Sequence, residues 1–81
     1  MSCEIVFAVS NNTATHLQEY RPFISLLSSQ AQAWRLEPFE DDERKVRKQR
    51  FVVVVNTEQK QRLMQEIVEL SKQFCRIHFS N

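Results

Sequence analysis

The densest group of residues able to do chemistry is a run of positive charges near the middle of the sequence. Five basic side chains fall within seven positions: Arg44, Lys45, Arg47, Lys48 and Arg50. Such a cluster is typical of an arm that contacts nucleic-acid phosphates. Five acidic residues come directly before it: Glu37, Glu40, Asp41, Asp42 and Glu43. In a hairpin turning at residues 40–43 the two blocks face each other, and opposite charges attract across strands. A self-neutralising, solvated hairpin is therefore favoured over a phosphate-binding or protein-docking arm.

The other reactive side chains are scattered and form no catalytic or metal-binding pattern. Cys3 and Cys75 each begin an expected strand, at opposite ends of a sheet, which is too far apart for a disulfide. His16 falls near an expected loop, and His78 is expected on the exposed sheet face, where an ordinary surface histidine is favoured over a pair with Glu4. The sequence lacks the spacings that bind zinc and the arrangements that activate a serine nucleophile. We therefore expect no enzyme, no metal ion and no cofactor.

The composition narrows the class of protein further. Glycine is absent, which excludes the glycine-rich loops that cradle phosphates and the dinucleotide fingerprint. With 42% hydrophobic and 26% charged residues, residues 1–81 are typical of one ordinary globular domain. A net charge of +1 gives no general attraction to nucleic acid or membranes. No apolar run approaches the roughly 20 residues that cross a bilayer, and the first residues do not resemble a signal peptide. We expect a cytoplasmic protein.

Hydrophobic patterns predict four strands, at residues 3–10, 31–39, 44–56 and 75–80. Pro38 near the end of the second strand indicates an edge strand, where a missing N–H does no harm. The third strand ends in a wholly apolar run, Phe51–Val55. Such a run indicates a central strand covered on both faces.

Steps of three and four between apolar residues predict two helices. The first ends near Ser29, and it either begins near residues 19–21 with Pro22 in its first turn or runs from Thr15 with a kink at Pro22. We favour the shorter helix. Asn56 or Thr57 is expected to cap the second helix. Its core stripe is Leu63, Ile67, Leu70 and Phe74.

The resulting order of elements, β-α-β-β-α-β, predicts a fold of the α+β class. With right-handed crossovers this order gives the ferredoxin-like, or split-βαβ, sandwich. A four-stranded antiparallel sheet then carries both helices on one face, with the first and third strands in its centre. The name describes topology only, because two cysteines cannot hold an iron–sulfur cluster.

The sheet face that the helices leave open is the most informative expected surface. Side chains alternate between the two faces of a strand, so even-numbered positions of the first and third strands turn outward. If the second strand turns its large residues outward as well, the open face carries one apolar patch: Val6, Ala8, Trp34, Leu36, Val52 and Val54. Monomers rarely expose such a patch, so it indicates a partner. A one-residue change of register in the second strand would instead place Trp34 in the core under the helices.

These expectations favour a small non-enzymatic protein-interaction module, acting as a regulator, adaptor or inhibitor. It would bind another protein through the open face or form a homodimer, with no membrane partner. The alternative is a nucleic-acid-binding protein that uses the basic residues from Arg44 to Arg50. An RNA-recognition motif shares the topology but stacks bases on aromatic residues of the first and third strands, where this chain has valine and alanine. A small metal-dependent nuclease is least favoured, because the first strand ends in "AVSNN" without an acidic residue.

Overall fold

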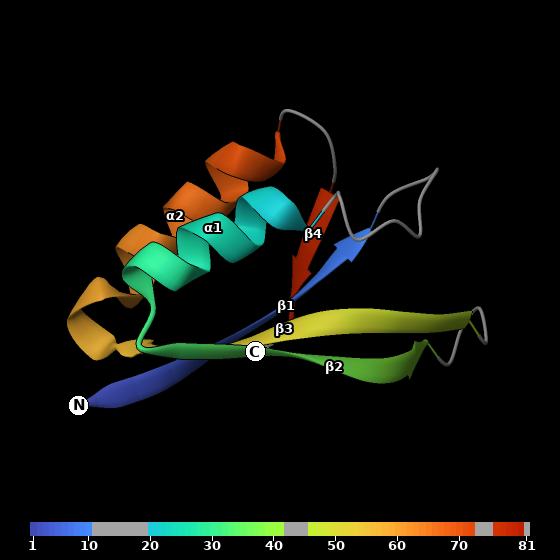
Figure 1. Ribbon diagram of the computed structural model, residues 1–81, viewed down its shortest axis with the longest axis horizontal. Helices are drawn as coiled ribbons and strands as arrows, with labels where there is room; N and C mark the ends of the chain where they lie inside the picture. Colours follow the sequence, from blue (N-terminus) through green and yellow to red (C-terminus); the bar gives the residue numbers. More distant parts are fainter. Residues whose placement is uncertain (11–19, 42–45, 73–75, 81) are drawn as a thin grey trace.

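The chain forms a four-stranded sheet with two helices packed on one side (Figure 1). The computed structural model describes residues 1–10, 20–41, 46–72 and 76–80, and of residues 10, 40, 41 and 46–48 the backbone only. The elements in chain order are β1 (Ser2–Ser10), α1 (Arg21–Gln30), β2 (Ala33–Asp41), β3 (Val46–Asn56), the 3-10 turn η2 (Thr57–Gln59), α2 (Lys60–Ser71) and β4 (Arg76–Phe79). The expected α+β architecture of a four-stranded antiparallel sheet and two helices is confirmed.

The strands lie in the order β2-β3-β1-β4, and each is antiparallel to its neighbours. β3 and β1 therefore occupy the centre of the sheet, as the apolar run of β3 predicts. Pro38 lies on the edge strand β2, where a missing N–H is tolerated. β4 has only four residues and pairs with the C-terminal half of β1, from Phe7 to Ser10.

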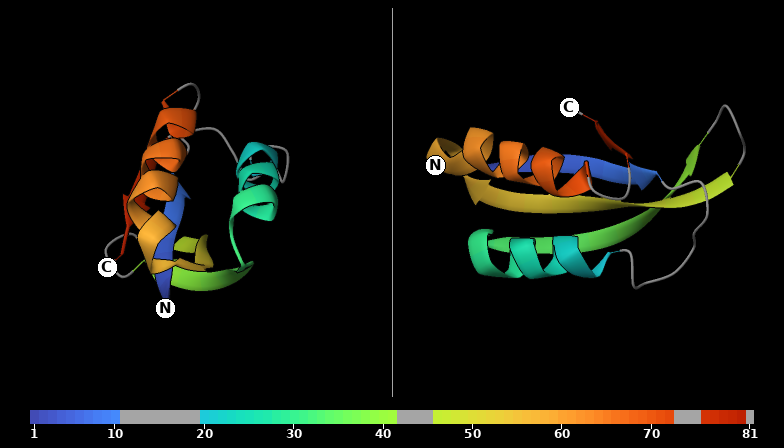
Figure 2. Two further views of the ribbon diagram at one scale, coloured as in Figure 1. Left: turned by 90° about the vertical axis from the view of Figure 1, so that its left-hand side faces the viewer. Right: turned by 90° about the horizontal axis from the view of Figure 1, so that it is seen from above.

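Both helices begin where their sequences favour a helix start. α1 starts at Arg21 with Pro22 in its first turn, where the ring displaces no helical hydrogen bond, so the shorter predicted helix is confirmed. Asn56 caps the second helical segment, because its side-chain oxygen accepts a 3.1 Å hydrogen bond from the N–H of Glu58. Phe74, predicted to end the second helix's core stripe, lies outside the described residues. In the end-on view of Figure 2, α2 lies over β1 and α1 lies toward the β2 side.

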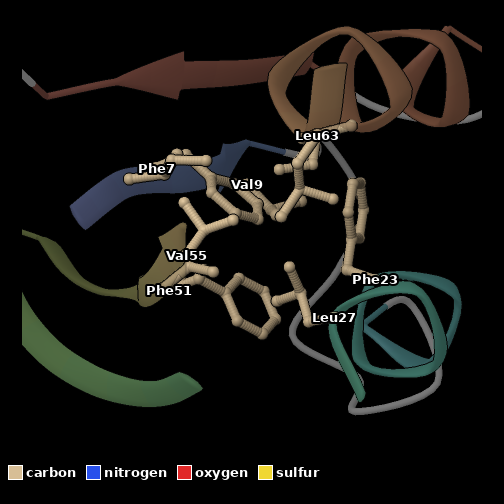
Figure 3. Packing of buried hydrophobic residues seen from close by; sticks show 10 residues of the cluster. Phe7, Val9, Phe23, Leu27, Phe51, Val55 and Leu63 are labelled. Atoms are coloured by element: carbon tan, nitrogen blue, oxygen red, sulfur yellow. The ribbon is translucent and has the colours of Figure 1, made fainter. Parts of the chain in front are cut away.

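Three phenylalanine rings form the centre of the core, between the helices and the inner face of the sheet (Figure 3). Phe7 on β1 and Phe51 on β3 are direct partners in the register, and their rings stack with 5.0 Å between centroids. Phe23 on α1 adds a third ring, with its centroid 5.8 Å from that of Phe7 and 6.2 Å from that of Phe51. The remaining large, fully buried side chains are Ile5, Leu27, Val53, Val55, Leu63 and Ile67. The odd-numbered positions of β1 and β3 thus face the core, as alternation predicts.

The predicted orientation of the second strand is wrong. Trp34 is the register partner of Val53, and Leu36 is the partner of Phe51. Because partners in an antiparallel pair share a face, Trp34 and Leu36 lie on the helix-covered face, half-buried against the core. The indole of Trp34 lies 6.0 Å from the ring of Phe51. The strand alternates large apolar residues with charged ones, and removing the apolar set from water stabilises this orientation.

This orientation of β2 predicts that substitutions at two adjacent positions differ greatly in their effect on the free energy of unfolding. Trp34→Ala should lower the free energy of unfolding by about 2–3 kcal/mol, somewhat less than the loss at a fully buried tryptophan. Arg35→Ala, on the other face with 59% of its side chain exposed, should change it by less than about 1 kcal/mol. Urea denaturation followed by circular dichroism measures both. Equal, small losses at the two positions would place Trp34 on the open face after all.

Candidate interaction surface

No described element covers the face of the sheet opposite the helices (Figure 1). The strand registers align the side chains of this open face in rows that run from β2 to β4. The first three rows are Ala33–Val54–Glu4, Arg35–Val52–Val6–Ser80 and Glu37–Arg50–Ala8–His78. Phe39 and Arg76 stand at the two ends of the fourth row.

The apolar part of the open face is a narrow strip along β1 and β3. Val6 and Val54 are half-buried, whereas Val52 and Ala8 are buried, with 3% and 9% of their surface exposed. We call these four residues the valine strip. Because the two predicted residues of β2 lie on the other face, the strip is smaller than the patch expected from the sequence.

Beside the valine strip lies an open-face charged cluster of Arg35, Glu37 and Arg50. The Nε of Arg50 donates a 2.7 Å hydrogen bond to Oε1 of Glu37, and its Nη2 pairs with the same oxygen. The other oxygen, Oε2, lies 3.5 Å from Nε of Arg35. The Arg50 guanidinium also lies over the ring of Phe39, 5.5 Å from its centroid, which favours a cation–π interaction. One carboxylate is thus shared by two guanidiniums, which leaves the cluster with a net positive charge.

The charged cluster lowers the pKa of Glu37 below its ordinary value. The largest cause is the hydrogen bond from Arg50, and the positive charges of Arg50 and Arg35 add to it, while partial desolvation acts in the opposite direction. Glu37 therefore stays ionised at neutral pH. It remains an acceptor on a face whose other described side chains of β2 and β3 are apolar or basic, apart from Asn56 at the end of β3.

The register confirms that the acidic and basic blocks of the hairpin face each other. Glu37 is the partner of Arg50, and Glu40 is the partner of Arg47. The Arg50 guanidinium is already bound by an acid of its own chain and is not free for a phosphate. The side chains of the other four basic residues lie outside the described part of the chain: Arg44, Lys45, Arg47 and Lys48.

The remaining reactive residues do not converge on one site. Cys3 is a free, half-buried thiol whose Sγ lies 3.6 Å from the carbonyl oxygen of Val55. Cys75 and His16 lie outside the described residues. In the ranges 1–10, 20–41, 46–72 and 76–80, no group of three histidine, cysteine or acidic residues could hold a metal ion. No helix in the same ranges is long and apolar enough to cross a membrane.

His78 lies exposed on the open face, and the alternative that pairs it with Glu4 is wrong. Its register partner on β1 is Ala8 and not Glu4. The reason is that β4 pairs with the C-terminal half of β1, which leaves Glu4 at the end of the sheet beyond β4. The sequence analysis also missed Arg35 and Phe39 as open-face residues. The signal that finds them is the pairing of Glu37 with Arg50, because one such pair fixes which face every residue of β2 occupies.

A second surface is an open groove of about 770 Å³ between the outer sides of α1 and α2. Leu26 and Leu70 provide its apolar lining, and Arg62, Glu66 and Glu69 line its polar part. The Nε of Arg62 lies 3.9 Å from Oε1 of Glu66, a spacing typical of a solvated ion pair on a helix. This mixture of opposite charges gives the groove no preference for one ligand chemistry.

Comparison with known proteins gives no relative from which a function could be transferred. No protein-family model matches the chain, and no curated protein and no solved structure matches it significantly. The geometry of the open face is therefore the basis for the function proposed below.

The lowered pKa of Glu37 predicts a defined dependence on pH. Because this pKa is lower in the folded chain than in the unfolded chain, ionised Glu37 stabilises the fold above the unfolded pKa. That contribution is lost as the pH falls through the folded pKa. Arg50→Gln removes the largest cause of the shift and should raise the Glu37 pKa toward its ordinary value. A carboxyl ¹³C NMR titration of both proteins measures it, and an unchanged midpoint in Arg50→Gln would contradict the assigned cause.

Proposed function

We propose that this chain is a small non-enzymatic protein-interaction module that acts through the open face of its sheet, as a regulator, adaptor or inhibitor in the cytoplasm. The observation that carries the proposal is the valine strip, which alternation in the β1–β3 register places on the face away from the helices and whose half-buried members are Val6 and Val54. The charged cluster borders this strip. An apolar centre with a polar rim is the usual composition of a protein–protein interface.

We also assign the chain to the ferredoxin-like topology. The order of elements along the chain supports this assignment, as do the sheet order β2-β3-β1-β4 and the antiparallel pairing of all neighbours. In this topology the helices use one face of the sheet for the core. The other face remains for a partner.

A nucleic-acid-binding role for residues 44–50 is the alternative function. The Glu37–Arg50 hydrogen bond disfavours it, because the acid neutralises the basic residue that reaches the open face. Binding to a labelled oligonucleotide at low salt, weakening steeply as salt is added, would favour this alternative.

The proposal predicts association of the chain in solution, with a second copy as the first partner to test. Light scattering over a wide range of concentrations should show a rise from monomer to dimer mass. Val54→Glu should raise the dissociation constant at least about tenfold, a cost of about 1.4 kcal/mol, because it places a charge in the valine strip. Gln65→Glu is the matched control, on an exposed position of α2, and should leave the constant unchanged.

The two variants must first be shown to be folded by circular dichroism. A wild-type chain that remains monomeric at every concentration would contradict self-association. An equal effect of Val54→Glu and Gln65→Glu would move the interface away from the open face.

A further inference from the structure

We infer that the open face binds a second copy of this chain, sheet against sheet, so that β2 of each copy lies over β4 of the other. This inference rests on the proposed function, because it requires the open face to be a binding surface. It adds the identity of the partner and the orientation of the two copies. Both follow from the order of side chains in the rows of the open face.

Two packed sheets keep their strands nearly aligned, which leaves two symmetric ways to stack a pair of copies. If the two-fold axis runs along the strands, each row faces the same row of the partner in reverse order. If the axis runs across the strands, β2 lies over the partner's β2 and the order of the rows is reversed. The side chains of the open face differ enough between rows to separate these arrangements.

The axis along the strands places apolar side chains on apolar side chains. In the second row Val52 then faces the partner's Val6, and the symmetry repeats this contact. In the third row Arg50 faces the partner's Ala8, a small residue that leaves room for the guanidinium to keep its hydrogen bond to Glu37. In the first row Val54 faces the partner's Glu4 at the end of the sheet, where no β4 residue lies beside Glu4 and its carboxylate can turn into water.

The same arrangement also matches the charged and aromatic groups at the edges of the sheet. Glu37 on β2 faces the partner's His78, whose imidazole N–H is a donor for the carboxylate. Phe39 faces the partner's Arg76, a cation beside an aromatic ring. Each contact occurs twice, so four complementary contacts surround the valine strip.

The axis across the strands gives a poorer match. It brings Arg35 near the partner's Glu37, but it also presses the Arg50 guanidinium against the partner's Val52. Val52 is among the most buried residues of the open face. The side chain of Val52 is larger than that of Ala8, so it leaves less room for the Arg50 guanidinium to keep its hydrogen bond to Glu37.

The position of α1 opposes pairing of the two copies through their β2 edges with all helices on the same side of a continuous sheet. In both views of Figure 2, α1 lies above the outer side of β2. A second β2 added at this edge with its helices on the same side would bring its own α1 into the same space. Stacking of the open faces avoids this clash, because all helices then lie on the outside.

Cross-linking at chosen positions tests the orientation. In a chain with Cys3→Ala and Cys75→Ala, the double variant Arg35→Cys with Ser80→Cys is treated with a bismaleimide that spans about 10 Å, the distance between packed sheets. Arg35 faces the partner's Ser80 in the inferred dimer, so the double variant should give a covalent dimer linked between positions 35 and 80. Each single variant should give at least severalfold less, and Ser25→Cys with Gln65→Cys on the helix side should give none.

The outcomes separate this inference from the proposed function. A covalent dimer of equal yield from Arg35→Cys alone would indicate β2 over β2 and overturn the orientation. A dimer in light scattering that Val54→Glu weakens but that shows no 35–80 link would also overturn it, while the proposed function would stand. A chain that stays monomeric overturns the inference of a second copy.

A matched pair of substitutions at one exposed position provides a test that does not need the cysteine-free chain. His78→Glu opposes the partner's Glu37 and should raise the dissociation constant about tenfold, whereas His78→Lys should leave it equal or lower it. Equal constants for the two variants, measured by light scattering, would overturn the inferred contact.

Discussion

The stacked pair of Phe7 and Phe51 is the contact on which the rest of the structure depends. It joins the two central strands near the C-terminal end of their register on β1, and it fixes which side of each strand faces the helices. Because side chains alternate along a strand, this one pair determines that Val52 and Val54 lie on the opposite face. Phe23 then packs against both rings and brings α1 onto the sheet. The position of the valine strip on the face away from the helices is thus a consequence of the core.

The open-face charged cluster fixes which face of the edge strand β2 turns toward the helices. Arg50 immediately precedes Phe51, so it must lie on the open face, and its hydrogen bond holds Glu37 on that face as well. The alternating residues of β2, Trp34 and Leu36, are thereby directed into the core. The charged cluster and the burial of Trp34 and Leu36 therefore require the same orientation of β2.

The sequence predicts the elements well because their signals are local. Pro22 marks the first turn of α1, Asn56 marks the start of the second helical segment, and the run Phe51–Val55 marks a central strand. The orientation of β2 is not local, because β3 is apolar on both faces and accepts apolar residues of β2 on either side. Charge pairing resolves it: once Glu37 is matched with Arg50, Trp34 can only face the helices. The predicted apolar patch is wrong at Trp34 and Leu36 because alternation within β2 does not by itself fix which of its faces turns toward the helices.

The central claim is that the open face, and not the helix side, is where this chain binds a second copy of itself. Amide chemical shifts measured by ¹⁵N-HSQC on serial dilution test it residue by residue. The claim predicts concentration-dependent shifts at Val6, Arg35, Val54 and Ser80, with Ser25 and Gln65 beside the helix groove unchanged. Shifts confined to the helix groove, or no shift at any concentration, would contradict it.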